Sequence, residues 1–95
     1  MNYPTETDRP ENATKYNGWT NYETWNVSLY IQNEEPLYRE AVRYVRQCER
    51  LDEKVSYANF SDVLSMLHGF KTPDGVSWTD YSLDTDELNE MLEEL

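Results

Sequence analysis

Apolar positions recur every three or four residues along most of this chain, a spacing that predicts α-helices. The clearest case is residues 21–32, because Glu23 is the only charged residue among residues 18–32. One face of this helix carries Tyr22, Trp25 and Leu29, and the opposite face carries Val27 and Ile31. A helix that is apolar on two sides usually lies in the core, so we expect this one at the centre of the fold.

Capping signals predict where two of the helices begin. Thr20 and Glu23 are spaced as a capping box, in which the Thr20 hydroxyl accepts from the Glu23 N–H and the Glu23 carboxylate accepts from the Thr20 N–H. Asp84 and Glu87 repeat this spacing before a last helix, which we expect to run to the C-terminus.

Two further helices are predicted between these. Residues 35–51 have one apolar face and carry Pro36 in the first turn, where its missing N–H is not needed. A shorter helix is predicted over residues 62–68, with Ser61 as its cap and Gly69 as its stop. After the turn signal Thr72-Pro73-Asp74-Gly75, residues 76–78 are predicted to be extended.

The length of the chain, 95 residues, fits one small domain. Residues 1–15 contain two prolines and no apolar period, which predicts a disordered N-terminal arm. The remainder, residues 16–95, is predicted to be a single, mostly α domain of four helices with at most one short extended segment.

The net charge of −11 disfavours direct binding to nucleic acid or to an anionic membrane and favours a basic protein partner. The single cysteine, Cys48, has no partner for an internal disulfide and lies on a predicted apolar face, so we expect it to be buried. The chain has no secretory signal and no apolar run long enough for a bilayer, which predicts a cytoplasmic protein.

Charges are sorted between two helices. From residue 72 onward there are eight acidic residues and no Lys or Arg. On the last helix an acidic face, opposite Leu88, Met91, Leu92 and Leu95, consists of Asp86, Glu87, Glu90, Glu93 and Glu94. Half of the eight basic residues form a stripe on the helix 35–51: Arg39, Arg43, Arg46 and Arg50. Each set is either a solvated helix face or a docking surface, the acidic one for a basic groove and the basic one for phosphate or an acidic partner.

Four aromatic residues are candidates for the core: Trp19, Tyr22, Trp25 and Trp78. Large rings dominate the apolar area that a small domain buries, which favours a core role. For Trp19, Tyr22 and Trp25, the alternative is an exposed aromatic platform on which a partner docks.

Catalytic, metal-binding and cofactor motifs are not recognisable in the sequence. His68 is the only histidine, and it has no Cys or second His at ligand spacing. No serine has a plausible base, and no glycine-rich phosphate loop is present. We therefore expect a non-enzymatic protein without a cofactor or metal.

Four segments together resemble a family of small acidic proteins of cyanobacteria, phages and other mobile elements. They are GWTNYETWNV at residues 18–27, NEEPLY at residues 33–38, TPDGVSW at residues 72–78 and DELNEMLEEL at residues 86–95. The resemblance implies a shared fold and a phage or mobile-element setting. That family has no assigned biochemistry, so the resemblance supplies no catalytic residues.

These observations lead to one functional prediction and two rivals. The favoured function is an interaction protein, a modulator or inhibitor whose acidic last helix binds a basic, nucleic-acid-binding surface of another protein as a nucleic-acid mimic. The first rival is a structural or assembly subunit that forms a homodimer by pairing its Arg stripe with the acidic helix of another copy. The second is a small-molecule or lipid pocket built from the aromatic residues.

Overall fold

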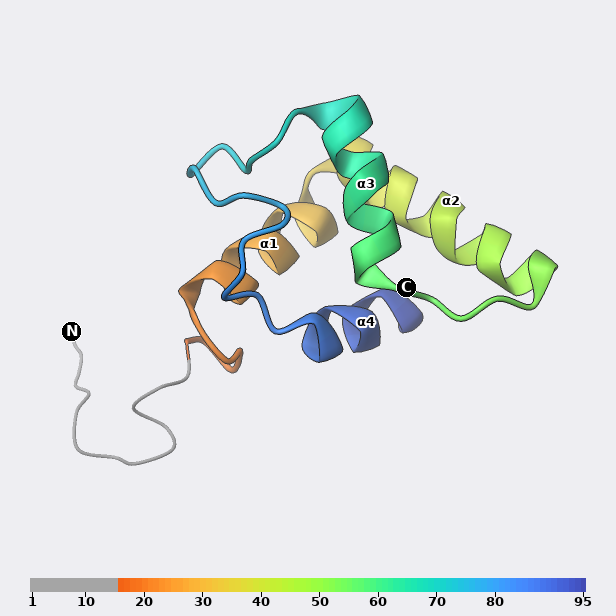
Figure 1. Cartoon of the computed structure of the whole chain (residues 1–95), viewed down its shortest axis with the longest axis horizontal. Coiled ribbons are helices and arrows are strands. Elements are labelled where there is room, and N and C mark those ends of the chain that lie inside the picture. The colour runs from red at the N-terminus through yellow and green to blue at the C-terminus, as the bar shows by residue number, and fades with distance from the viewer. Residues whose placement is uncertain (1–15) are drawn as a thin grey trace.

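The computed structural model describes residues 16–95, and the predicted arm at residues 1–15 lies outside the described residues. The mostly α class is confirmed, because the described residues form helices with two isolated bridges and no strand. No helix in this part of the chain is both long and apolar enough to cross a bilayer. The helices are α1 (Tyr22–Asn33), α2 (Glu35–Leu51), α3 (Tyr57–His68) and α4 (Thr85–Glu93), as Figure 1 shows.

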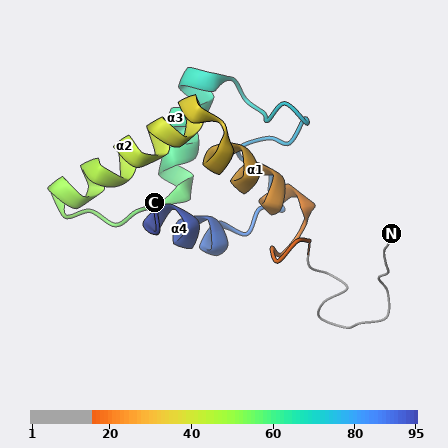
Figure 2. The same ribbon diagram turned by 180° about the vertical axis from the view of Figure 1, so that it is seen from behind.

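The helices pack around α4 and α2. α4 contacts each of the other three helices, and α2 does the same, whereas α1 and α3 do not contact each other. The connection between α3 and α4 runs back past α1, as both views show (Figures 1 and 2). The last helix is therefore held against the beginning of the domain.

The predicted capping box at the start of α1 is wrong. Asn21 is the N-cap, and its side chain accepts a hydrogen bond of 2.9 Å from the Thr24 N–H. Thr20 faces α4 instead, because its N–H donates to Glu87 Oε1 at 2.9 Å and its hydroxyl donates to Asp84 Oδ2 at 2.8 Å. Asn caps a helix as well as Thr does, so the tertiary contacts of Thr20 decide which residue takes the role.

The predicted bounds of α2 are confirmed. The helix ends at Leu51 because Asp52 adopts a left-handed conformation with φ 55°, and its N–H donates to the carbonyl groups of Cys48 and Glu49. Cys48 is buried, as predicted. Asp84 caps α4 as predicted, accepting from the Glu87 N–H at 3.1 Å. The reciprocal half of this capping box is wrong, because the Asp84 N–H donates to Thr24 Oγ1 at 2.9 Å and the Glu87 carboxylate accepts from the Thr20 N–H. However, α4 ends at Glu93 rather than at the C-terminus.

The predicted start of α3 is wrong. The helix begins at Tyr57, and its cap is Ser56, which accepts from the Asn59 N–H at 3.3 Å. Ser61 lies inside the helix and donates to the Ala58 carbonyl at 2.7 Å. The sequence pattern does not predict the first turn of α3, because the buried side chain of that turn is Tyr57. Its hydroxyl is buried and donates to the Trp78 carbonyl at 2.7 Å. Burial raises the pKa of the Tyr57 phenol.

The core lies between one face of every helix and the α3–α4 connection. α1 contributes Val27 and Ile31, both fully buried, and not the face that carries Tyr22. Asn26, next to Tyr22 around the helix, is also fully buried, so α1 is buried on most of its surface, and Tyr22, Gln32 and Asn33 are its exposed residues. The largest fully buried apolar side chains are Trp78, Tyr57, Phe60, Ile31, Leu64, Leu88, Leu92, Val27 and Val45.

A buried polar network attaches the α3–α4 connection to α1. Asn26 is fully buried, and its amide donates to Asp74 Oδ2 at 2.8 Å while its carbonyl accepts from the Thr72 hydroxyl at 2.7 Å. The Thr72 hydroxyl also accepts from the Val76 N–H at 3.1 Å. Because a buried amide without partners is costly, this network fixes the turn at residues 72–75 in one place on α1.

Candidate functional site

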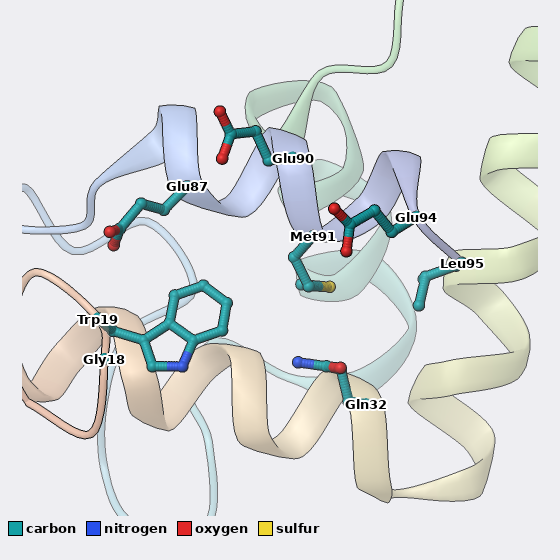
Figure 3. A pocket seen from close by; sticks show the side chains of 8 residues that line it. All are labelled: Gly18, Trp19, Gln32, Glu87, Glu90, Met91, Glu94 and Leu95. Carbon is teal, nitrogen blue, oxygen red and sulfur yellow. The ribbon is translucent and has the colours of Figure 1, made fainter.

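An acidic groove lies between α4 and the segment that leads into α1. Its volume is about 340 Å³. Figure 3 shows that residues of α4 line one side and residues of α1 and its preceding turn line the other. We call this site the acidic groove, and its lining residues are Gly18, Trp19, Gln32, Glu87, Glu90, Met91, Glu94 and Leu95.

Hydrogen bonds hold the two walls of the groove together at one end. Thr20 contacts both Glu87 and Asp84, as described above. Asn21 adds a bond of 2.7 Å from its side-chain amide to the Ser82 carbonyl. The carboxylate of Glu87 thus has a structural role in the groove wall, in addition to its charge.

The α4 wall carries three carboxylates that the sequence places on one predicted face: Glu87, Glu90 and Glu94. They follow each other at spacings of three and four residues, so successive side chains are neighbours on the helix surface. Ionised carboxylates only accept hydrogen bonds. Glu90 and Glu94 are exposed and Glu87 is half-buried, so this wall presents acceptors and negative charge to a ligand.

Apolar side chains lie beside these carboxylates rather than on the opposite side of the helix. Met91 and Leu95 line the same groove as the three Glu residues, which corrects the expectation of fully separated acidic and apolar faces. Trp19 stands across from Met91 in Figure 3. Lys and Arg side chains combine a cation with an apolar stem, and an indole face attracts cations. The mixed lining therefore suits a Lys or Arg side chain.

The other two predicted acidic residues lie outside the groove lining. Asp86 and Glu93 are both exposed on α4, and neither is among the residues that line the cavity. The structure thus divides the predicted acidic face into a groove set of three and an outer set of two.

The basic stripe on α2 is paired largely within its own helix. Arg39 contacts Glu35 at 2.6 Å, and Arg46 lies 3.5 Å from Glu49. Arg43 lies 4.0 Å from the carboxylate of Glu40. All four arginines of the stripe are exposed. Exposed pairs of this kind contribute about 0–1 kcal/mol, so the stripe has little effect on stability.

The four candidate core aromatics divide into three environments. Trp78 is a core residue with 1 % of its surface exposed, and Trp19 is half-buried against the core. The core prediction is wrong for Tyr22, which is 38 % exposed. Trp25 is half-buried and packs on Tyr22 and Tyr16, with ring centroids 5.7 and 5.0 Å apart. These three rings form a surface cluster, so the alternative of an aromatic docking platform stays a prediction.

The sequence does not indicate that Gln32 or Trp19 shares a site with the carboxylates of the last helix. Gln32 reaches the groove only because α1 runs alongside α4 (Figure 3). Trp19 precedes α1, and its side chain enters the site because Thr20 is bonded to α4. The spacing of Met91 and Leu95 next to Glu87, Glu90 and Glu94 was the available signal for the α4 wall.

Fold and site define a small acidic all-α domain with a negatively charged groove between helices. The chain belongs to DUF7249, a family of unknown function whose model matches residues 12–95. No curated protein matches the chain. No solved structure matches it either.

Proposed function

We propose that this protein is a non-enzymatic interaction protein that binds a basic segment of another protein in the acidic groove. The observation that carries the proposal is the joint lining of one cavity by three carboxylates and the indole of Trp19. A guanidinium or ammonium group placed there gains charge attraction and a cation–π contact, while its stem covers Met91.

Its binding energy comes from several weak contacts. Exposed ion pairs contribute about 0–1 kcal/mol each, so a single Lys or Arg would bind weakly. A partner that presents several cations along a groove would gain from each of them, and its association would be accelerated by the net charge of −11.

The finer form of the proposal is that the protein modulates or inhibits a partner by occupying its nucleic-acid-binding surface. Carboxylates three and four residues apart on a helix lie about 5–6 Å from each other, close to the phosphate repeat along one DNA strand. The proposed setting, a phage or another mobile element acting in the cytoplasm of its host, rests on the sequence resemblance alone.

A binding role is favoured over catalysis by the positions of the two most reactive side-chain types. Cys48 is the only cysteine and is buried in the core, with 3 % of its surface exposed. His68 is the only histidine and lines a different cavity from the three groove carboxylates. Neither of these two side chains therefore lies in the acidic groove.

The test compares two double variants with the same change in net charge. Glu90→Gln with Glu94→Gln neutralises the groove, and Asp86→Asn with Glu93→Gln neutralises the outer face of the same helix. A partner captured from host lysate by the wild-type protein is identified, and its association rate is then measured at low and high salt. We expect the groove variant to associate roughly three- to tenfold more slowly at low salt, with a flatter salt dependence.

The control decides whether position or overall charge matters. If the outer variant slows association as much as the groove variant, the partner responds to net charge and the groove is not its binding site. Equal rates for all three proteins would show that α4 is only a solvated helix. The rival homodimer is tested on the same proteins, because light scattering would report a wild-type dimer that dissociates in the groove variant.

A further inference from the structure

A second cavity lies at the other end of α1, where α2 begins. Its volume is about 340 Å³. Both views place the start of α2 next to the end of α3 and the connection that follows it (Figures 1 and 2). We call this site the α2 pocket, and it is lined by Glu34, Pro36, Leu37, His68, Lys71, Pro73 and Trp78.

Two buried nitrogen atoms of the α2 pocket residues lack hydrogen-bond partners. They are Trp78 Nε1 and His68 Nε2, and no partner for either lies among the described residues. Trp78 is 1 % exposed, so its N–H is removed from bulk water. An unsatisfied buried donor costs about 1–3 kcal/mol, and most buried polar groups are paired. Both residues line the α2 pocket, and an acceptor that reached either nitrogen from there would supply the missing partner.

The start of α2 adds further positive character to the α2 pocket. A 17-residue helix places the positive end of its dipole at this point. Glu34 is the N-cap, but its side chain makes no capping hydrogen bond. Lys71 lines the same cavity and is one of only eight basic residues in the chain. The indole N–H and the ammonium group can only donate hydrogen bonds.

We propose that the α2 pocket binds a small carboxylate with an apolar body. The carboxylate would accept from Trp78 Nε1–H and pair with Lys71, near the first turn of α2. Pro36, Leu37 and the ring of Trp78 form walls suited to an apolar group. A volume of about 340 Å³ is at the lower end of the range for small-molecule sites.

The charge of Glu34 allows the proposal to be tested by the direction in which the affinity changes. It is the only acidic residue that lines the α2 pocket, and its charge opposes an anion. Glu34→Gln should therefore tighten binding, and Lys71→Gln should weaken it. Lys54→Gln is a matched control, because Lys54 is exposed and does not line the pocket.

The experiment follows the indole N–H resonances of the full-length protein by ¹H–¹⁵N NMR. The chain has three Trp residues, so Trp19 and Trp25 serve as internal references for Trp78. The probes are sodium benzoate, its neutral analogue benzamide and inorganic phosphate, each titrated through the millimolar range. Unchanged Trp19 and Trp25 resonances in each variant show that its fold is retained.

We expect benzoate to shift the Trp78 resonance saturably, and benzamide and phosphate to shift it far less. Affinity for benzoate should fall about three- to fivefold in Lys71→Gln and rise by a similar factor in Glu34→Gln, with no change in Lys54→Gln. An unshifted Trp78 resonance would overturn the proposal. A benzamide response equal to that of benzoate would overturn the anion assignment, and an equal phosphate response would overturn the carboxylate assignment.

Discussion

The acidic groove and the α2 pocket have the same volume, about 340 Å³, but a different balance of charged groups. The groove presents the carboxylates of Glu87, Glu90 and Glu94, which only accept hydrogen bonds. The α2 pocket combines the donors of Trp78 and Lys71 with a single carboxylate, that of Glu34. Cavity size therefore does not indicate the ligand of either site. The hydrogen-bond donors, acceptors and charges of the lining residues do indicate it.

The two sites also differ in how their tryptophan is held. Trp78 lies in the core and is 1 % exposed, whereas Trp19 is half-buried at the edge of the groove. Both cavities are open to the surface, because most of their lining residues are exposed or half-buried, and they differ in the burial of their tryptophan. Their mutational sensitivities should differ accordingly.

The largest expected effect is the loss of Trp78. Trp78→Ala should cost about 3–5 kcal/mol and unfold much of the protein, because it removes a buried ring and leaves a cavity. Trp19→Ala should cost about 1–2 kcal/mol, because that side chain is only half-buried. Urea denaturation of both variants measures the difference. Equal losses of stability would contradict the assignment of Trp78 to the core and of Trp19 to the edge of the groove.

The next effect concerns the connection that carries Lys71 and Pro73 to the α2 pocket. Asn26→Leu should destabilise the protein by about 2–4 kcal/mol, because it leaves Thr72 and Asp74 without their buried amide partner. Asn33→Leu is the control, since Asn33 is exposed and bonds only within α1. Thermal unfolding that is equally affected by the two changes would show that the buried network does not hold the connection.

A smaller effect separates the carboxylates within the acidic groove. Glu87→Ala should cost about 1–2 kcal/mol, because the Thr20 N–H loses its charged acceptor. Glu90→Ala should leave stability unchanged or slightly higher, because it only relieves repulsion on an exposed face. Chemical denaturation at low salt compares the two. A destabilising Glu90→Ala would mean that Glu90 also has a structural contact.

The smallest effect concerns the turn that leads into α4. Asp80 accepts from the Ser82 N–H at 2.8 Å and from its hydroxyl at 2.6 Å, and these bonds lower the Asp80 pKa from its ordinary value of 3.8. The folded-state pKa of Asp80 therefore lies below its unfolded-state pKa. Ionised Asp80 stabilises the fold at pH values above the unfolded-state pKa, and this contribution is lost as the pH falls through the folded-state pKa.

Because Asp80 is exposed to solvent screening, its contribution should stay below about 1 kcal/mol. Asp80→Ala should remove it at neutral pH and make no difference at pH values well below 3.8. Melting temperatures across an acid pH series measure this. A difference between the two proteins that persists at the acid end would point to a role of Asp80 other than its charge.

The sequence was sufficient for the parts of the fold that depend on local signals. Pro36 and the apolar period of residues 35–51 predicted α2 with its observed bounds, and Asp84 predicted the start of α4. The cap of α1 was missed because Thr20 and Asn21 are both good caps, and the choice depends on contacts with α4.

For the candidate sites, the sequence predicted the charges but not the cavities. Helical spacing places Glu87, Glu90 and Glu94 together, yet only the packing of α4 beside α1 brings Trp19 and Gln32 to them. The α2 pocket depends on residues from three separate segments, and no local pattern connects them. Whether a buried nitrogen finds a partner is likewise a property of the packed fold.

The most direct test of the acidic groove as a binding site is a titration with the basic peptide Arg-Gly-Arg-Gly-Arg, followed through the Trp19 indole N–H resonance. The wild-type protein and the outer variant, Asp86→Asn with Glu93→Gln, should give the same saturable shift. The groove variant, Glu90→Gln with Glu94→Gln, should bind about fivefold more weakly. A Trp19 resonance that does not move, or equal weakening in the two variants, would contradict the assignment of this groove to a basic partner.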